Sequence, residues 1–266
     1  MTQSYVQQLC EILVRIEDDE AAALDRAARQ MTDTLMNKGL IHLFGSGHSV
    51  IPVLEVFPRY GGFVGFNPMT DPRLMWSNVL GPGGVSELLW LERTEGYVAQ
   101  YLSNQPIRKG DTVIVFSHGG LNAAPVEAAR YARQNGATVV AVTSGANAQR
   151  AATHSSGHRL SDEADIVIDT GVPAVDALIE IEGWPSSVGG ASTIAACVIA
   201  QSLVVEVARQ LAGRGHVLPT FVSPMAPNPP AEGNAGVFEA HRQRLLEAWT
   251  GWTGERTSSE QPTPLD

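Results

Sequence analysis

Small polar residues follow two short apolar runs of this sequence. The segment 45–49 comes directly after the apolar run 40–44, and the segment 117–122 comes after the run 112–116. Glycines let a backbone approach an anion closely, hydroxyl groups add donors, and a helix starting there adds unpaired N–H groups and a partial positive charge. This pattern predicts one pocket for a phosphorylated or otherwise anionic small ligand. The residues that we expect to contact this ligand are Ser46, Gly47, Ser49, Ser117, His118, Gly119, Gly120 and Asn122.

Two further side chains near the first polar segment could move protons. His48 lies inside that segment, and its imidazole titrates near neutrality, which suits proton transfer. Glu55 lies in the helix expected after the segment, among apolar residues. It is either a catalytic base or a partly buried partner, because unpaired buried carboxylates are rare. A purely structural role stays open for the serines and for Asn122, since these residue types favour turns and helix caps.

The histidines and cysteines do not form a pattern that binds a metal ion. His154 and His158 have a four-residue spacing, but Ser155, Ser156 and Gly157 between them argue against a helix. We expect loop contacts there, and no metal. Cys10 and Cys197 lie far apart in the sequence, so neither a disulfide framework nor a zinc site is indicated.

The two polar segments can form one pocket only in a fold that places both at the same edge of a sheet. Apolar runs alternate with helical patterns, which predicts an α/β fold with a doubly wound, mostly parallel sheet flanked by helices. In such sheets a ligand binds beyond the carboxyl ends of the strands, where the strand order reverses. We expect strands at 40–44, 63–66, 112–116, 138–142 and 165–169, helices at 4–38, 49–60, 87–104, 123–135, 192–212 and 237–249, and a long loop at 67–86.

Composition narrows the class of protein. The net charge is −10 at pH 7 and the pI is near 5.1, without the clustered Lys and Arg that a nucleic-acid-binding surface needs. We interpret no apolar run as reaching the length of a membrane span, and we recognise no basic and apolar blocks of a signal peptide at the N-terminus, so we expect a cytoplasmic protein without a membrane partner. We expect one domain over residues 1–250, with an N-terminal helical extension at 1–38 and a disordered tail at 253–266.

At these residues the sequence resembles the sugar-isomerase (SIS) domain family. The resemblance rests on the segments 44–49 and 116–122, then on 128–137 and 142–143, and it covers about residues 35–215. It implies a flavodoxin-type three-layer sandwich, a phosphorylated sugar as the ligand, and no cofactor. One position departs from the family pattern, because Gly119 stands where the second phosphate loop usually carries its second serine.

The resemblance also implies a reaction. SIS enzymes carry a catalytic glutamate on a helix shortly before the second phosphate loop, and Glu95, 22 residues before Ser117, has a similar position. We therefore expect an aldose–ketose isomerase of a phosphorylated sugar or amino sugar. Its base would be Glu95, with Glu92 as second choice, and His48 would open the ring. Two alternatives stay open, namely an etherase-like C–O lyase and a non-catalytic sensor of sugar phosphates.

The helical segments at 4–38 and 192–212 predict an assembly. The first has an apolar stripe and the second is apolar on nearly every side, so both have to be covered. In SIS proteins such helices join two subunits. We therefore expect a homodimer or a higher homo-oligomer.

Overall fold

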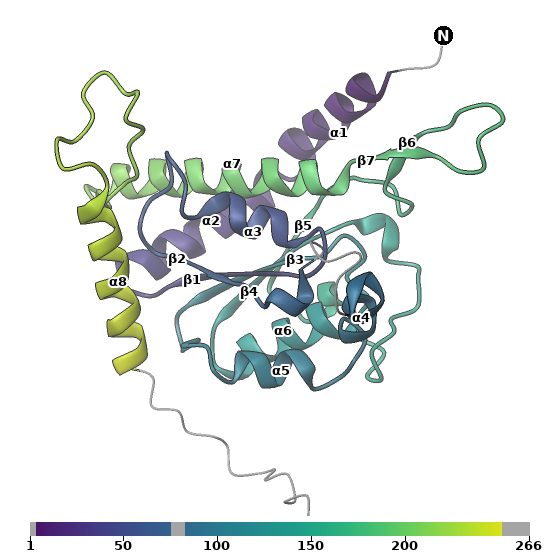
Figure 1. Cartoon of the computed structure of the whole chain (residues 1–266), viewed down its shortest axis with the longest axis horizontal. Coiled ribbons are helices and arrows are strands. Elements are labelled where there is room, and N and C mark those ends of the chain that lie inside the picture. Colours follow the sequence, from purple (N-terminus) through teal and green to yellow (C-terminus); the bar gives the residue numbers. More distant parts are fainter. Residues whose placement is uncertain (1–3, 76–82, 252–266) are drawn as a thin grey trace, which may run out of the picture.

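The fold is built on a parallel sheet of five strands. The computed structural model describes residues 4–75 and 83–251, and in this part the strands follow the order β2-β1-β3-β4-β5 (Figure 1). The chain begins the sheet at β1, adds β2 on one side and then returns to add β3 on the other. The order therefore reverses beside β1, and the predicted α/β fold is confirmed. The strands are β1 Ile41–Gly45, β2 Phe66–Met69, β3 Thr112–Phe116, β4 Thr138–Thr143 and β5 Ile166–Asp169.

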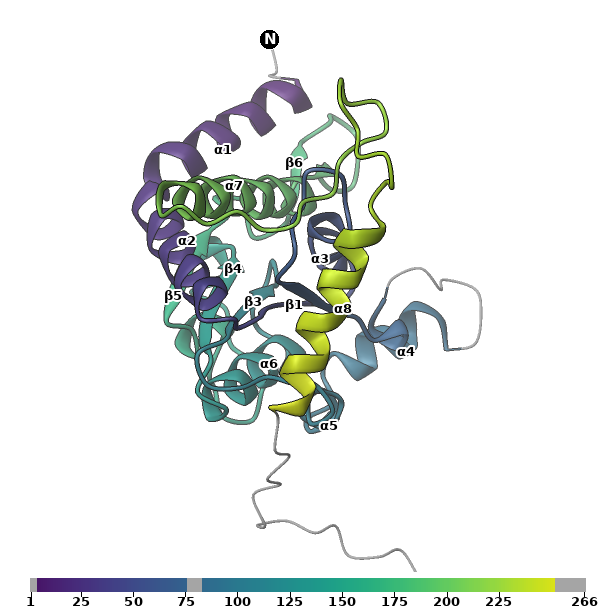
Figure 2. The same ribbon diagram turned by 90° about the vertical axis from the view of Figure 1, so that its left-hand side faces the viewer.

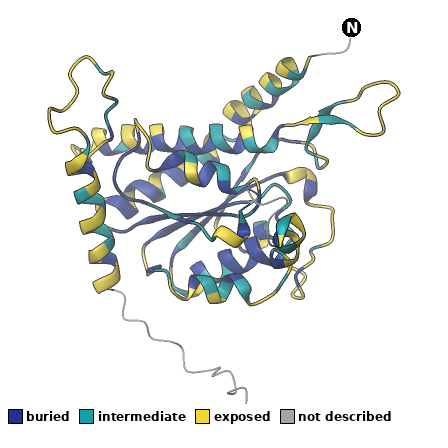
Figure 3. Ribbon diagram, viewed as in Figure 1, coloured by how far each residue is buried: buried dark blue, intermediate teal, exposed yellow. Residues whose placement is uncertain are grey.

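Helices cover both faces of the sheet. One hydrophobic cluster joins one side of the strands to α2, α3 and α7, and a second cluster joins the other side to α4, α5 and α6. Successive strand residues point to opposite faces, which is why both faces are apolar and buried (Figure 3). The bounds are α2 Ala21–Met36, α3 Val50–Val56, α4 Gly84–Leu91, α5 Tyr97–Leu102, α6 Ala123–Gln134 and α7 Ser192–Gly213.

The first and last helices extend this core. The expectation of one helix over 4–38 was wrong, because α1 (Tyr5–Asp19) ends where Glu20 leaves helical geometry, with φ −99° and ψ 4°. The last helix, α8 (Ala235–Thr250), runs past the edge of the sheet (Figure 2). It is tied to the end of α2 by Arg244, which donates hydrogen bonds to the carbonyls of Leu35 and Gly39 at 2.9 and 2.8 Å.

Helix α7 matches the long apolar helix expected over 192–212. Its 22 residues have a mean hydropathy of 1.5, so by length and composition it could cross a membrane, and our interpretation that no apolar run has that length was wrong. Within the fold it packs against α2 and α3, and eight of its residues are buried. A buried core helix has the same apolar character as a membrane span.

Two features were not predicted. The helix expected over 87–104 is divided into α4 and α5, which are separated by a turn at Glu92–Gly96. A small antiparallel ribbon of β6 (Ala177–Ile179) and β7 (Val188–Gly190) leaves the body before α7 (Figure 1). The expected loop at 67–86 contains the end of β2, a 3-10 turn at Pro72–Leu74 and the start of α4, and its residues 76–82 lie outside the described part.

Two further 3-10 turns, Gly145–Asn147 and Leu160–Asp162, complete the elements of the described part. The predicted tail at 253–266 also lies outside the described residues, and the single domain over 1–250 stays a prediction.

Candidate functional site

Both polar loops lie at the carboxyl ends of neighbouring strands. β1 and β3 pair in parallel with Gly45 opposite Phe116, so Ser46 and Ser117 leave the sheet side by side. The first loop leads into α3 and the second into α6, as the sequence predicted. Gly47 takes a positive φ of 57° and Gly120 one of 62°, a geometry that residues with a side chain rarely adopt. The fold therefore brings two helix N-termini to the point where the strand order reverses.

One carboxylate joins the two loops. Ser46 donates its hydroxyl to Glu92 Oε1 at 2.6 Å, and the side-chain amide of Asn122 donates to Glu92 Oε2 at 3.2 Å. The backbone carbonyl of Glu92 also accepts the N–H of Ala124 at 3.0 Å, in the first turn of α6. Glu92 is partly buried. It is thus held by contacts to both loops at once.

The break between α4 and α5 places Glu92 between the two polar loops. Leu88 and Leu91 bury the end of α4 in the core, and Glu92 follows directly as its C-cap. The chain then turns through Gly96, which has a left-handed φ of 84°, and its N–H donates to the carboxylate of Glu127. Glu127 is buried on α6, so the turn is fastened to the helix that begins at Asn122.

Glu95, the expected base, contacts residues outside the two polar loops. Its carboxylate accepts hydrogen bonds from the N–H and the hydroxyl of Ser155, each at 2.6 Å, and lies 3.9 Å from His154 Nε2. These Ser155 hydrogen bonds lower the pKa of Glu95, which weakens it as a base. Of the neighbouring glutamates, Glu92 is the one that contacts the polar loops. The catalytic role given to Glu95 stays a prediction, but these contacts favour Glu92.

The two other expected catalytic groups lie near the first loop. The Glu55 carboxylate forms an ion pair with Arg59, one helical turn further on, so its contact is with its own helix. His48 is exposed at the start of that helix. The structure therefore brings together Ser46, Asn122 and Glu92, but gives Glu55 a different partner.

A small hollow lies between the loops and α7. Its enclosed volume is about 10 Å³, which is on the scale of one water molecule. A sugar phosphate would therefore have to lie across its mouth or move its walls apart. Three of its polar residues, Thr170, Ser192 and Thr193, were not expected from the sequence. A pair of hydroxyl residues opening an apolar helix is the signal that could have found two of them. The lining residues are Ser49, Phe116, Ser117, His118, Val142, Thr170, Ser192, Thr193 and Ala196.

His118 has a distinctive place in this hollow. Its ring Nδ1 is buried and has no hydrogen-bond partner within the part of the chain that the structure describes, and its Nε2 lies 3.4 Å from the carbonyl of Ala174. Its backbone is fixed, since its carbonyl accepts hydrogen bonds from Asn147 Nδ2 and from the N–H of Ser144, both at 3.1 Å. A buried polar atom without a partner is costly, so a ligand contact at Nδ1 would remove that cost.

The N-terminus of α7 already carries a carboxylate. Asp176 accepts the N–H groups of Ala191 and Ser192 at 2.9 and 2.7 Å. Burial raises the pKa of Asp176, but these hydrogen bonds outweigh burial, so the net pKa lies below its usual value. Asp176 holds a left-handed backbone conformation (φ 66°) at this position. The N-terminus of α7 is the third helix N-terminus at the carboxyl edge of the sheet, after those of α3 and α6. A carboxylate of the protein itself therefore already occupies it.

The histidines at 154 and 158 contact carboxylates in separate places. His154 is near Glu95, and His158 Nδ1 lies 2.7 Å from Glu163 Oε1. Across residues 4–75 and 83–251, no group of three His, Cys, Asp or Glu side chains is arranged to hold a metal ion.

Known proteins resemble this chain in sequence and in fold. The SIS domain model matches residues 4–144. A UPF0309 protein of Listeria monocytogenes is 34% identical over 250 residues, 94% of this chain and 96% of the relative. A UPF0309 protein of Brucella canis is 35% identical over 246 residues, 92% and 97% of the two chains.

Among solved structures, a phosphoheptose isomerase from Francisella tularensis superposes with a TM-score of 0.53 at 15% identity. The match covers 79% of this chain and all of the isomerase. A phosphoheptose isomerase from Neisseria gonorrhoeae also has a TM-score of 0.53, at 15% identity, over 76% of this chain and 94% of its own. At this identity the likeness establishes the fold. The chain therefore belongs to the SIS domain family and, within it, to the UPF0309 proteins.

Proposed function

We propose that this protein is an isomerase of phosphorylated sugars in which Glu92 is the base. One observation carries the proposal, namely the carboxylate of Glu92 held between Ser46 and Asn122, where two strand ends and two helix N-termini meet. Such a helix end binds phosphate through backbone N–H groups. A carboxylate beside it is placed to act on the carbon atoms of the sugar attached to that phosphate.

The proposed reaction needs one proton carrier. Glu92 takes the proton from C2 of the open-chain aldose while the C1 carbonyl becomes an enediol. It then returns the proton to C1, as a hydroxyl proton passes from O2 to O1, and the ketose forms without net oxidation. The backbone donors and hydroxyls of the two loops would hold the phosphate. His48 remains our proposal for the group that opens the ring, and we add His118 as a donor or acceptor to the substrate.

The proposal is tested by exchange of the C2 hydrogen in deuterated water, followed by NMR with a panel of aldose and ketose phosphates. Glu92→Gln keeps the shape, and its amide can still accept from Asn122 and donate to the Ser46 hydroxyl, but it cannot accept a proton. We expect it to lose at least about a hundredfold in exchange rate, the low end for general acid–base catalysis. Glu95→Gln is the matched control, three residues away and outside the loop contacts.

The outcomes separate the candidates. Full exchange in Glu92→Gln and loss in Glu95→Gln would return the base to Glu95. Exchange that ends in loss of a substituent at C3 would favour the C–O lyase. Binding by the wild type of a sugar phosphate without any exchange would favour a sensor.

We also propose that the working unit is a homodimer. Val6 and Val14 on α1 and Val205 on α7 expose between 54% and 65% of their surfaces, and the two helices pack together. A contact with a second subunit would cover these exposed apolar side chains on two helices that pack together. We expect sedimentation equilibrium at micromolar concentration to give twice the chain mass of 28.4 kDa. A stable species of one chain would contradict the dimer.

A further inference from the structure

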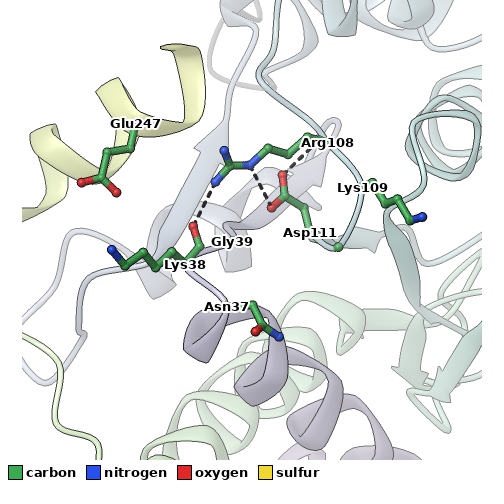
Figure 4. Close-up of a pocket in the computed structure, with 8 residues that line it drawn as sticks. Asn37, Lys38, Gly39, Arg108, Lys109, Asp111 and Glu247 are labelled. Carbon is green, nitrogen blue, oxygen red and sulfur yellow. Dashed lines mark hydrogen bonds and ion pairs between the residues drawn. The ribbon is translucent and has the colours of Figure 1, made fainter. Parts of the chain in front are cut away.

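A second cavity of the described residues lies at the opposite edge of the sheet. It has a volume of about 400 Å³ and is open to solvent, within the range of small-molecule sites. The turn after α2, the turn before β3 and helix α8 form its walls, at the amino ends of β1 and β3 (Figure 4). Its lining residues are Asn37, Lys38, Gly39, Arg108, Lys109, Gly110, Asp111 and Glu247.

Both lysines of the protein line this cavity. The 266-residue sequence contains two lysines, Lys38 and Lys109, and both line the cavity. In Figure 4 they lie on either side of Arg108 and Asp111. Arg108 is half-buried, and its guanidinium is held by a hydrogen bond from Nη2 to the carbonyl of Lys38 at 3.0 Å. In a chain of net charge −10, three cations around one cavity are a local reversal of charge.

The buried carboxylate among these cations is already engaged. Asp111 accepts hydrogen bonds from the N–H of Leu40 at 2.9 Å and of Arg108 at 3.0 Å, and its Oδ2 lies 3.1 Å from His42 Nε2. Its Oδ1 also lies 3.9 Å from Arg108 Nε, and its side chain is 1% exposed, so these contacts, and not a ligand, use its charge. Glu247 on α8 is then the acidic side chain that remains exposed at the cavity.

Lys38 occupies a position that suits glycine. It is the first residue beyond the C-cap of α2, with a left-handed φ of 59°. Its N–H donates to the carbonyl of Leu35, and the N–H of Gly39 donates to that of Thr34, which is the Schellman ending. A side chain in this conformation costs roughly 1–2 kcal/mol. A strained residue kept where glycine is favoured points to a use for its side chain.

We propose that this cavity binds a small polyanion of the pyrophosphate or bisphosphate class. Arg108, whose Nη2 and Nε face the Lys38 carbonyl and Asp111, would add its positive charge beside one anionic group. Lys38 and Lys109, on flexible stems, would reach the others from either side. Three cations spread around one cavity fit a ligand with several negative charges better than a single phosphate. The site is separate from the proposed isomerase pocket, because it lies at the amino ends of the strands.

Calorimetry with pyrophosphate at fixed ionic strength tests the proposal. We expect Lys38→Gly and Lys109→Ala each to weaken binding by about tenfold, the scale of one hydrogen bond to a charged group. Lys38→Gly should raise the melting temperature, since glycine relieves the left-handed strain. Glu247→Gln should tighten binding, because it removes a negative charge from the cavity wall. Arg209→Ala, which removes an exposed cation paired with Glu206 on α7, is the matched control and should leave affinity unchanged.

A second readout uses the two lysines directly. Pyrophosphate should protect both Lys38 and Lys109 from an amine-reactive reagent, as measured by mass spectrometry of the two lysine-containing peptides. Inorganic phosphate at the same concentration should protect them less. Glu92→Gln should retain full protection, so failure of the isomerase proposal would not affect this result. Absence of pyrophosphate binding to the wild type, or equal weakening by Arg209→Ala, would overturn the proposal.

Discussion

The two edges of the sheet offer anions two different kinds of site. At the carboxyl edge, the donors are backbone N–H groups and the hydroxyls of Ser49 and Ser117, with Glu92 as the charged side chain that bridges the loops. At the amino edge, Lys38, Arg108 and Lys109 surround a cavity that is far larger. The first site depends on backbone geometry, which only the whole fold provides. The second depends on side chains that could be exchanged one at a time.

The difference predicts where substitutions are tolerated. At Gly45, beside the first loop, the main chain of Ser49 approaches closely, so an added methyl group has to displace the main chain. At Gly110, which lines the cavity of the amino edge, the space around an added methyl group is open. Gly45 and Gly110 give a direct test of this contrast.

The largest expected effect is on Gly45, at the end of β1. A Cβ at this position would lie 2.1 Å from the backbone oxygen of Ser49. Gly45→Ala must therefore shift the first loop, and we expect a loss of about 3 kcal/mol or more in free energy of unfolding, within the range for severe core substitutions. At the amino edge, a Cβ on Gly110 would meet nothing within 4 Å, although its φ is 89°. Gly110→Ala should cost only roughly 1–2 kcal/mol of backbone strain.

Urea unfolding of both variants measures these values. Equal losses in the two variants would mean that close main-chain packing does not distinguish the edges.

A smaller gain is expected from Gly119→Ser, which restores the hydroxyl found in the family pattern. The nearest atom to a Cβ here is Leu121 Cγ, at 4.0 Å, so a serine fits without displacing its neighbours. A new hydroxyl donor to a phosphate should tighten a sugar phosphate by about 1 kcal/mol, if the carboxyl edge is where phosphate binds. Calorimetry against the wild type checks this, with Gly119→Ala as the control that adds the methyl group alone. An unchanged affinity in Gly119→Ser would argue against phosphate contact at this loop.

The smallest effect concerns the internal anion of the carboxyl edge. The folded pKa of Asp176 lies below its ordinary value of 3.8. Its stabilising contribution is therefore complete above that ordinary value and is lost as the pH falls through the lower, folded pKa. We expect Asp176→Asn to be less stable than the wild type at pH 7, and the difference to shrink on acidification below about pH 4. Thermal unfolding of both proteins between pH 7 and pH 3 measures it. A constant difference would mean that the Asp176 charge does not stabilise the end of α7.

The sheet and the two loops could be predicted because their signals are local. An apolar run followed by Gly and Ser specifies a strand end and a turn within ten residues, and four of the five strands overlap the expected ranges fully or nearly so. The second strand was placed too early, at 63–66, whereas β2 is Phe66–Met69. Its residues include Pro68, a type that is depleted in strands and confined to their edges, so the pattern hid it.

The choice between Glu92 and Glu95 could not be made from local sequence. Both residues fit a continuous helix over 87–104, and the break depends on Gly96 taking a left-handed conformation with its N–H on Glu127. That contact joins residues 31 positions apart. The lysine cavity has the same origin, because the turns that carry Lys38 and Lys109 meet only after β1 and β3 pair.

The separation of α2 and α7 along the chain has a consequence for biosynthesis. α7 is covered by α2, with Asp33 of α2 paired to Arg214 at the far end of α7, yet residues 192–213 are synthesised long after residues 21–36. A ribosome would therefore release a finished α2 well before its partner exists. When α7 then leaves the ribosome, its apolar sequence is exposed until it packs against α2 and α3. Rapid docking of α7 on α2 would shorten the time during which the nascent chain can aggregate at this step.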